Sequence, residues 1–365
     1  MVANGAGIPG IKEFSVTNSN YFTCDTWHAT VALDGTPSGY GAPFWALQSY
    51  IEVQLLASFT GAGALTQIIS GVVDKVEVCL DEQEIKLSGR DFSAPLIDTL
   101  TNVKLVNQTS SQIATKFAQD AGLVPQVTAT SIKAGRFLNQ QTDYAAEDMS
   151  QFRLLSYLAQ QEGFDLYMKG KTMVFAPQQS TGAPLRVIYT YATPGAPPIS
   201  ANAVRLQLMQ DKTLADFVTV EVRSWDYTTK TAIISTWQSQ KTQQAPRAGH
   251  AAGAPSLSFT KAETSGSKNG RGPLYIVRRS GLTQQQADQL AQKTLSDITL
   301  NERSVLWEGP AILDVDARRM FNLSGTRTAF DQTYEIGEVQ RTFSWNSTSM
   351  TIHAKASSPQ EAVAL

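Results

Sequence analysis

Hydrophobic residues alternate with polar ones along much of this 365-residue chain, and this period of two restricts the fold more than any other feature of the sequence. Val218, Val220 and Val222 give the clearest example, since polar or charged residues stand between them. In a strand, such spacing sends every second side chain to the same face of a sheet. Residues 14–100 follow the same pattern and predict a small antiparallel sheet or barrel.

In the middle of the chain the hydrophobic spacing changes to that of a helix. Ile113 and Phe117 lie four residues apart on one predicted helix, and Gly122 is placed to end it in a left-handed conformation. A second apolar stripe ends at Gly163 in the same way, and a hairpin that turns at Gly170 follows it. The order helix, glycine, strand therefore occurs twice and predicts a middle α/β domain.

Strand-like alternation returns between residues 185 and 240 and again near residue 350. Between these regions, residues 241–273 are rich in Gly, Ser, Pro and Ala without a period, which predicts a long loop. Residues 282–299 carry an apolar stripe and predict a third helix. The sequence thus predicts an α+β fold, mainly β, in which two strand-rich domains flank the middle α/β domain. The expected domain boundaries are 1–100, 101–180 and 181–365.

Charge and composition argue against several classes of function. The formal net charge is −2, and Lys and Arg are scattered with never more than two in a row, so no basic stripe is present for sequence-specific nucleic-acid binding. No apolar stretch reaches the roughly 18 residues that span a bilayer, so membrane insertion is not expected. Cys24 and Cys79 are too few for a disulfide scaffold, and the first residues lack a signal-peptide pattern. We therefore expect synthesis in a reducing cytoplasm.

Motifs that carry chemistry are missing or lie in the wrong context. His28, His250 and His353 are isolated from one another, and only Cys24 and His28 lie close together in the sequence, which argues against a metal site. No G-x-S-x-G pentapeptide marks a serine nucleophile. Residues 5–10 match G-x-G-x-x-G, but no strand precedes them and a strand-like segment follows, so a dinucleotide site is not expected. The sequence predicts no catalytic, cofactor-binding or metal-binding residue, and we expect that the protein is not an enzyme.

Several segments, taken in order, resemble one known family. They are "KLSGRDFSAPLIDT" (86–99), "SSQIATKFAQDAGL" (110–123), "LLSYLAQQEGFDLYMKGKTMVF" (154–175) and "FDQTYEIGEVQRTFSW" (330–345). This order is similar to the late control D family of phage tail baseplate hub proteins, which is related to the hub portion of type VI secretion spike proteins. Gln332 replaces a glycine that the family often has, and "DARRMFNLSG" replaces its Pro-Gly-Asp turn. The residues expected to determine the fold are Gly89, Gly122, Leu158, Gly163, Gly170, Phe175, Phe330 and Tyr334.

The resemblance implies that the flanking domains are small antiparallel β-barrels of the tail-tube type and that the protein is a homotrimer. Three subunits would then present six barrels, joining a sixfold tail tube to a threefold spike. The implied partners are the spike (tail-tip) protein, a tail tube or distal tail protein and a baseplate wedge protein, with the end of the tape measure protein as a further expectation. Such a hub would lie in the virion tail baseplate after assembly in the host cytoplasm, and DNA would pass it once the spike has left.

The predicted loop 241–273 is the candidate segment for reaching a partner, and its alternative is a tolerated surface insertion. Its candidate contact residues are Arg247, His250, Lys261, Lys268 and Arg271. Two other functions remain open on the sequence. One is the hub of a type VI-like or other contractile injection apparatus, and the other is a tail-associated cell-wall hydrolase.

Overall fold

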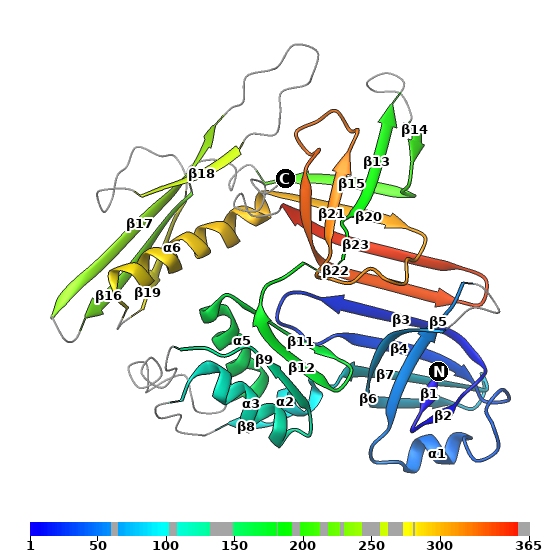
Figure 1. The fold of residues 1–365 in the computed structure, drawn as a ribbon. Coiled ribbons are helices and arrows are strands. Elements are labelled where there is room, and N and C mark those ends of the chain that lie inside the picture. Colours follow the sequence, from blue (N-terminus) through cyan, green and yellow to red (C-terminus); the bar gives the residue numbers. More distant parts are fainter. Residues whose placement is uncertain are drawn as a thin grey trace. The chain divides into compact units, whose positions relative to one another are not determined.

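The computed structural model describes residues 1–59, 65–101, 108–131, 149–180, 182–191, 198–211, 218–226, 230–242, 256–261, 273–279 and 282–356 (Figure 1). The chain divides into two compact units: the first holds residues 1–180, 309–318 and 337–351, and the second holds the remainder. Neither unit is continuous in sequence. Among the described residues, no helix has both the length and the apolar character needed to cross a membrane.

An antiparallel sheet forms one part of the first unit. Its strands are β1 (Val2–Ala3), β2 (Ala6–Gly7), β3 (Ile11–Ser19), β4 (Thr26–Ala32), β5 (Glu52–Ala57), β6 (Thr66–Cys79) and β7 (Glu84–Asp91), in the order β3-β4-β7-β6-β5-β1-β2. A short helix, α1 (Ala42–Leu47), precedes β5. Residues 338–344 of β22 (Thr333–Ser344) pair with the other side of β3. The alternation read from the sequence is present here, since β4 buries Trp27, Ala29 and Val31.

Gly89 of β7 allows a close approach inside this sheet. A methyl group at this position would stand 1.9 Å from the carbonyl oxygen of Val72 and 2.7 Å from a ring carbon of Trp27. Both distances are far inside van der Waals contact, so only glycine fits. The β6–β7 register shifts between Val73 and Lys75 at the same place, which is the usual signature of a bulge.

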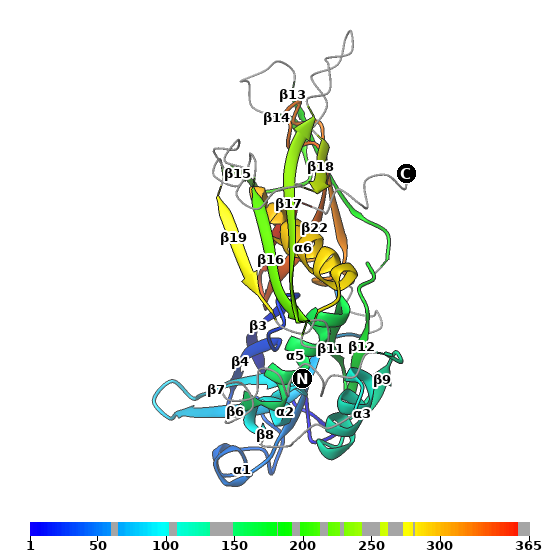
Figure 2. The ribbon, with the colours of Figure 1, turned by 90° about the vertical axis from the view of Figure 1, so that its left-hand side faces the viewer.

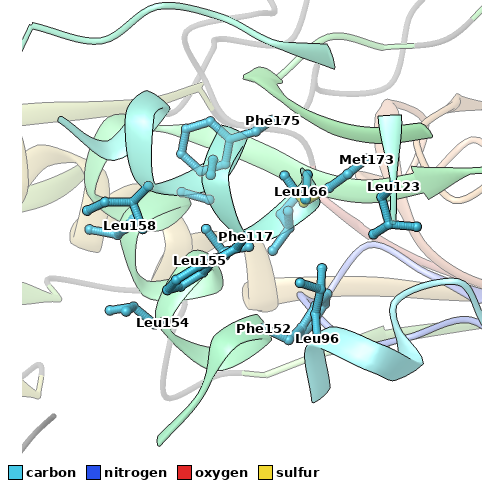
Figure 3. Packing of buried hydrophobic residues seen from close by; sticks show 14 of the residues in the cluster. Leu96, Phe117, Leu123, Phe152, Leu154, Leu155, Leu158, Leu166, Met173 and Phe175 are labelled. Carbon is cyan, nitrogen blue, oxygen red and sulfur yellow. The ribbon is translucent and has the colours of Figure 1, made fainter. Parts of the chain in front are cut away.

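The middle α/β region belongs to the first unit as well. It contains α2 (Ala94–Asp98), β8 (Leu100–Thr101), α3 (Ser110–Asp120), β9 (Val124–Val127), β10 (Met149–Ser150), α5 (Gln151–Glu162), β11 (Phe164–Lys169) and β12 (Thr172–Pro177). β11 and β12 form an antiparallel hairpin, and β9 adds to β12 in parallel. Figure 3 shows the core between the helices and this sheet, where Phe117, Leu155, Met173 and Phe175 are fully buried.

The ends of these elements follow from local chemistry. Thr109 and Gln112 form a reciprocal capping box at the start of α3, which satisfies two backbone donors. Gly163 ends α5 with a φ of 71°, a left-handed conformation that glycine adopts without a steric penalty. Gly122 and Gly170 also have positive φ, 71° and 59°, after α3 and in the β11–β12 turn.

One sheet of the second unit is built from strands that are far apart in the sequence. They are β13 (Leu185–Tyr191), β14 (Pro198–Ala201), β15 (Arg205–Gln210), β20 (Arg303–Gly309), β21 (Met320–Ser324), the first residues of β22, and β23 (Thr348–Ala356). β13 pairs with β14 and, in parallel, with β21, while residues 333–335 of β22 pair with β21. β20 pairs with β15 on one side and β23 on the other.

The side chain of Asn202, directly after β14, bonds to the backbone of β13 and so continues the pairing of these two strands. Its amide nitrogen donates to the carbonyl oxygen of Arg186 at 2.8 Å, and its Oδ1 accepts from the Ile188 N–H at 3.0 Å. Its own carbonyl oxygen accepts from Trp307 Nε1 of β20 at 3.2 Å. The described strands of the chain form no closed barrel. The mainly β, α+β fold is therefore confirmed, whereas the barrel form of the flanking domains is not.

A second sheet of this unit has the order β18-β17-β16-β19. Its strands are β16 (Thr219–Asp226), β17 (Thr231–Thr242), β18 (Ser256–Lys261) and β19 (Leu274–Arg278). α6 (Gln284–Thr299) packs against β16 and β17, and the 3-10 turn η1 (Leu300–Glu302) follows it. Figure 2 shows α6 behind these two strands, with β19 at the edge of the sheet.

The structure differs from the predicted long loop at residues 241–273. β17 extends to Thr242, and β18 lies inside the predicted loop, where it pairs antiparallel with β17. The six residues of β18 do alternate, with Leu257 and Phe259 between polar neighbours, but they stand between segments rich in Gly, Ser and Pro. A pattern this short carries little signal in such surroundings. Residues 243–255 and 262–272 are outside the described part of the chain.

Candidate functional site

A cluster of buried polar groups lies in the first unit, and it starts from two carboxyl groups. Asp91, at the end of β7, accepts hydrogen bonds from the backbone N–H of Ser93 at 3.0 Å and from the Ser93 hydroxyl. Asp25, just before β4, accepts from Asn18 Nδ2 at 2.8 Å and from the Ser19 N–H at 2.9 Å. The two are joined directly, because the N–H of Asp25 donates to Asp91 Oδ2 at 3.4 Å and the N–H of Asp91 donates to the Asp25 carbonyl oxygen at 2.9 Å.

The positively charged residues of this cluster, Arg318 and Arg341, come from a distant part of the chain. Arg341, on β22, is 3% exposed; its Nη2 donates to Asn18 Oδ1 at 2.5 Å and its Nη1 to the Leu313 carbonyl oxygen at 3.0 Å. Arg318 lies over the ring of Tyr167 at 3.6 Å from the ring centre, a cation–π contact with β11. The cluster therefore ties residues 311–318 and β22 to the strands formed by the first hundred residues.

Burial governs the protonation of the two carboxyl groups. It raises the pKa of Asp91 to about 6, and the nearby charge of Asp25 adds to this shift. Burial raises the pKa of Asp25 as well, against the hydrogen bonds from Asn18 and Ser19. Burial also lowers the pKa of the Arg341 guanidinium. The partners that bond to these groups belong to the same fold, which makes the cluster a structural cross-link.

No arrangement of metal ligands accompanies it. Across the described ranges, no three side chains of His, Cys, Asp and Glu come together as a cation site. Cys24, beside Asp91, has a raised pKa because of burial, which disfavours the reactive thiolate.

Leu158 and Phe175, two of the predicted fold-determining residues, meet in the middle core with Gly163 and Gly170 at the ends of the surrounding elements. The structure thus groups these four, and Gly122 closes the neighbouring helix α3. Gly89 lies instead in the sheet of the first unit.

Phe330 and Tyr334 come together in the second unit, near the start of β22. The buried Tyr334 donates its hydroxyl to the Phe330 carbonyl oxygen at 2.8 Å, and burial raises the pKa of this phenol. The guanidinium of Arg303 lies 5.9 Å from the centre of the Phe330 ring and donates to Gln332 Oε1 at 3.4 Å. Gln332, which stands where the resembling family often has glycine, is thus part of this local network.

Only one of the candidate partner-contact residues is described. Lys261 is the last residue of β18, and its ammonium group donates to Asp288 Oδ2 of α6 at 2.7 Å. This contact stabilises the sheet–helix packing of its own chain. The other four, Arg247, His250, Lys268 and Arg271, lie outside the described residues.

Exposed aromatic and aliphatic side chains are the surface features that sequence reasoning missed. Trp345 is 88% exposed in the β22–β23 turn. The turn itself is well bonded: the Ser344 N–H donates to the Ser347 carbonyl oxygen at 2.9 Å, and Ser344 Oγ donates to Asn346 Oδ1 at 3.0 Å. An exposed indole on a well-bonded turn supplies a large, ordered contact area to a partner chain.

Two further exposed apolar side chains lie beside the connection between β5 and β6. Phe59 and Leu65 are 55% and 64% exposed on either side of it. Apolar side chains exposed next to each other on one hairpin supply surface for contact with another chain.

Comparisons with known proteins place the fold. No family model and no curated protein matches the sequence. Among solved structures, a tail protein from Neisseria meningitidis gives a TM-score of 0.63 at 12% identity, covering 97% of this chain and 94% of that one. The 43 kDa tail protein of prophage MuSo2 from Shewanella oneidensis gives 0.61 at 14%, covering 97% and 96%. Prophage tail protein gp18 from Listeria monocytogenes gives 0.55 at 10%, covering 95% and 90%.

A further match has a type VI secretion context. An Escherichia coli protein, described as a component of that system with structural similarity to the T4 tail proteins gp27 and gp5, gives a TM-score of 0.50 at 11% identity, covering 98% of this chain and 76% of that one. At these identities the likeness concerns the fold. The chain therefore has, along nearly its whole length, the fold found in these phage tail and secretion proteins.

Proposed function

We propose that this protein is a structural baseplate hub of a bacteriophage tail. The observation that carries the proposal is the fold match along 97% of the chain to two tail proteins, one of them from a prophage. The hub-like order of sequence segments between residues 86 and 345 points the same way. The polar cluster around Asp25 and Asp91 supports a structural role, because its groups bond to their own fold.

In the proposed hub, three copies form a ring. Each copy contributes two strand-rich domains of the tail-tube type, and six such domains match a sixfold tube on one side and a threefold spike on the other. The partners are the spike protein, a tube or distal tail protein, a wedge protein and the end of the tape measure protein. Exposed apolar groups such as Trp345 and Phe59 supply contact surface for such an assembly.

The charge of the chain suits passage of DNA after the spike has left. With a formal net charge of −2 and no basic run, a ring of this protein would hold DNA weakly. The loop segments around β18 remain candidates for reaching a neighbouring tail protein.

Light scattering on the purified protein, alone and with its spike protein, tests the proposal. We expect three copies of the 39.6 kDa chain in each particle, with the mass of the spike protein added when the spike is bound. A monomer that persists in the presence of the spike at micromolar concentration would contradict the trimeric hub. Electron microscopy of tails should then place the protein between tube and spike.

Two other functions are distinguished by simple observations. A hub of a contractile injection apparatus is supported by the type VI secretion match, and the genes beside this one would separate it from a phage hub. A cell-wall hydrolase would clear peptidoglycan in a zymogram, and we expect no clearing.

A further inference from the structure

β19 is an edge strand with an open side. It pairs in parallel with β16 from Thr219–Leu274 to Arg223–Arg278, and no described strand pairs with its other side. Figure 2 shows it at the edge of the four-stranded sheet. A strand paired on one side leaves a row of backbone N–H and C=O groups that can bond to another strand.

The side chains of β19 are unusually apolar for such an edge. Leu274, Tyr275 and Ile276 are 51%, 38% and 43% exposed, and no other described strand exposes three consecutive large apolar residues. They belong to both faces of the sheet, because neighbouring residues of a strand point to opposite sides. α6 packs against β16 and β17 and leaves these side chains uncovered.

Four other strands with an open side in the described part of the chain carry features that discourage strand addition. β9 contains Pro125 and β14 begins at Pro198, and proline cannot donate to a ladder. β15 begins at Arg205 and β18 ends at Lys261, and charged residues at an edge also discourage pairing. β19 follows Pro273 and ends at Arg278, but residues 274–277 between them are all apolar. This uninterrupted apolar run at an open edge suits a partner strand.

The positive charge at the end of β19 indicates which charge the partner segment carries at that position. Arg278 and Arg223 stand at paired positions of neighbouring strands, where like charges repel. The guanidinium of Arg223 donates to Glu221, whereas no described side chain forms an ion pair with Arg278. A carboxylate placed beside Arg278 would neutralise the remaining charge.

We propose that β19 binds an extended segment of a different protein as a fifth strand of this sheet. The segment carries large apolar side chains along β19 and an Asp or Glu opposite Arg278. Backbone hydrogen bonds supply affinity, and the apolar contacts and the carboxylate supply specificity, as in other cases of strand addition. A second copy of β19 fits poorly, because antiparallel pairing centred on Ile276 would set Arg278 against Leu274. The proposal does not depend on the hub function.

A labelled peptide measures this binding directly. The probe is fluorescein-labelled Glu-Val-Ile-Thr-Ile, whose antiparallel register puts Glu opposite Arg278, and the readout is fluorescence anisotropy with the full-length protein. Comparison peptides replace Glu by Lys or carry N-methyl groups on alternate amides. We expect the Glu peptide to bind at least about tenfold more tightly than the Lys peptide, and N-methylation to abolish binding.

Charge reversal in the protein provides the matched control. Arg278→Glu should reverse the preference between the Glu and Lys peptides, whereas Arg186→Glu, on β13, should leave it unchanged. Unaltered circular dichroism and Tm would show that both variants fold. Three results would overturn the proposal: no binding of the Glu peptide up to about 1 mM, equal binding of both peptides, or a preference unaffected by Arg278→Glu. If the protein without peptide dimerises, and Arg278→Glu changes this dimerisation, the edge would instead bind a second copy of the chain.

Discussion

Arg341 donates a hydrogen bond from Nη2 to Oδ1 of Asn18 at 2.5 Å, although 323 positions separate them in the sequence. The two residues lie on β22 and β3, neighbouring strands of the first unit. Because Arg341 is 3% exposed and also holds the Leu313 carbonyl oxygen, its removal would leave several buried polar groups without a partner.

We therefore expect Arg341→Ala to lower the free energy of unfolding by about 1.5–3 kcal/mol, the range for hydrogen bonds made by a charged group. Urea denaturation measures it. The exposed Arg186→Ala serves as control and should change stability by less than about 0.5 kcal/mol. A loss below about 1 kcal/mol for Arg341→Ala would show that the cluster does not hold the first unit together.

The raised pKa of Asp91 predicts that acidification stabilises the fold. Its pKa is about 6 when folded, against 3.8 as the ordinary value, so the native state binds more protons between these values. Stability then falls as pH rises through this window, by up to about 3 kcal/mol from this group alone. The raised pKa of Asp25 acts in the same direction. Unfolding free energies between pH 4 and pH 7.5 should show this slope in the wild type and a smaller one in Asp91→Asn; equal slopes would contradict the assignment.

Gly89→Ala tests the close approach of β6 and β7. The added methyl group would meet the Val72 carbonyl oxygen and the Trp27 ring, both parts of the packed sheet. We expect a loss of at least about 2 kcal/mol, because the neighbours are backbone and a buried ring that must shift. Gly7→Ala, which would meet nothing within 4 Å, is the control and should be nearly neutral. Similar stabilities for the two variants would refute this explanation.

Gly163→Ala tests the end of α5. With a φ of 71°, alanine at this position is strained by about 1–2 kcal/mol. Gly163→Asn should cost less, since asparagine tolerates the left-handed conformation. The Tm of both variants, measured by thermal unfolding, tests this expectation. A higher Tm for Gly163→Ala than for Gly163→Asn would contradict it.

Trp345→Ser separates stability from assembly. Since the indole is 88% exposed, the variant should keep the Tm of the wild type. If the protein is the proposed hub and this turn contacts a partner in it, incorporation of the variant into phage particles should fall at least about tenfold, as expected for loss of an aromatic anchor. Leu80→Ser, at another exposed turn, is the control. Normal incorporation of Trp345→Ser would exclude this turn as an important contact.

Hydrophobic periodicity predicts the structural features that depend only on residues close together in the sequence. The left-handed turns at Gly122 and Gly163 and the alternation of β16 follow from local spacing. The strand β18 was missed because six alternating residues are a weak pattern between Gly- and Ser-rich segments. The contact of Arg341 with Asn18 could not be predicted, since it depends on which strands become neighbours. The same holds for Asn202, whose side chain bonds to the backbone of β13 at residues 186 and 188.

The two units share a constraint on how the chain folds during synthesis. The first unit needs residues 337–351, and the second needs residues 352–356 for part of β23. A ribosome that has made the first 300 residues has therefore supplied neither unit with all of its strands. Neither unit can complete its sheets before residues 337–356 have been synthesised, so partly folded chains with unpaired strand edges precede that point.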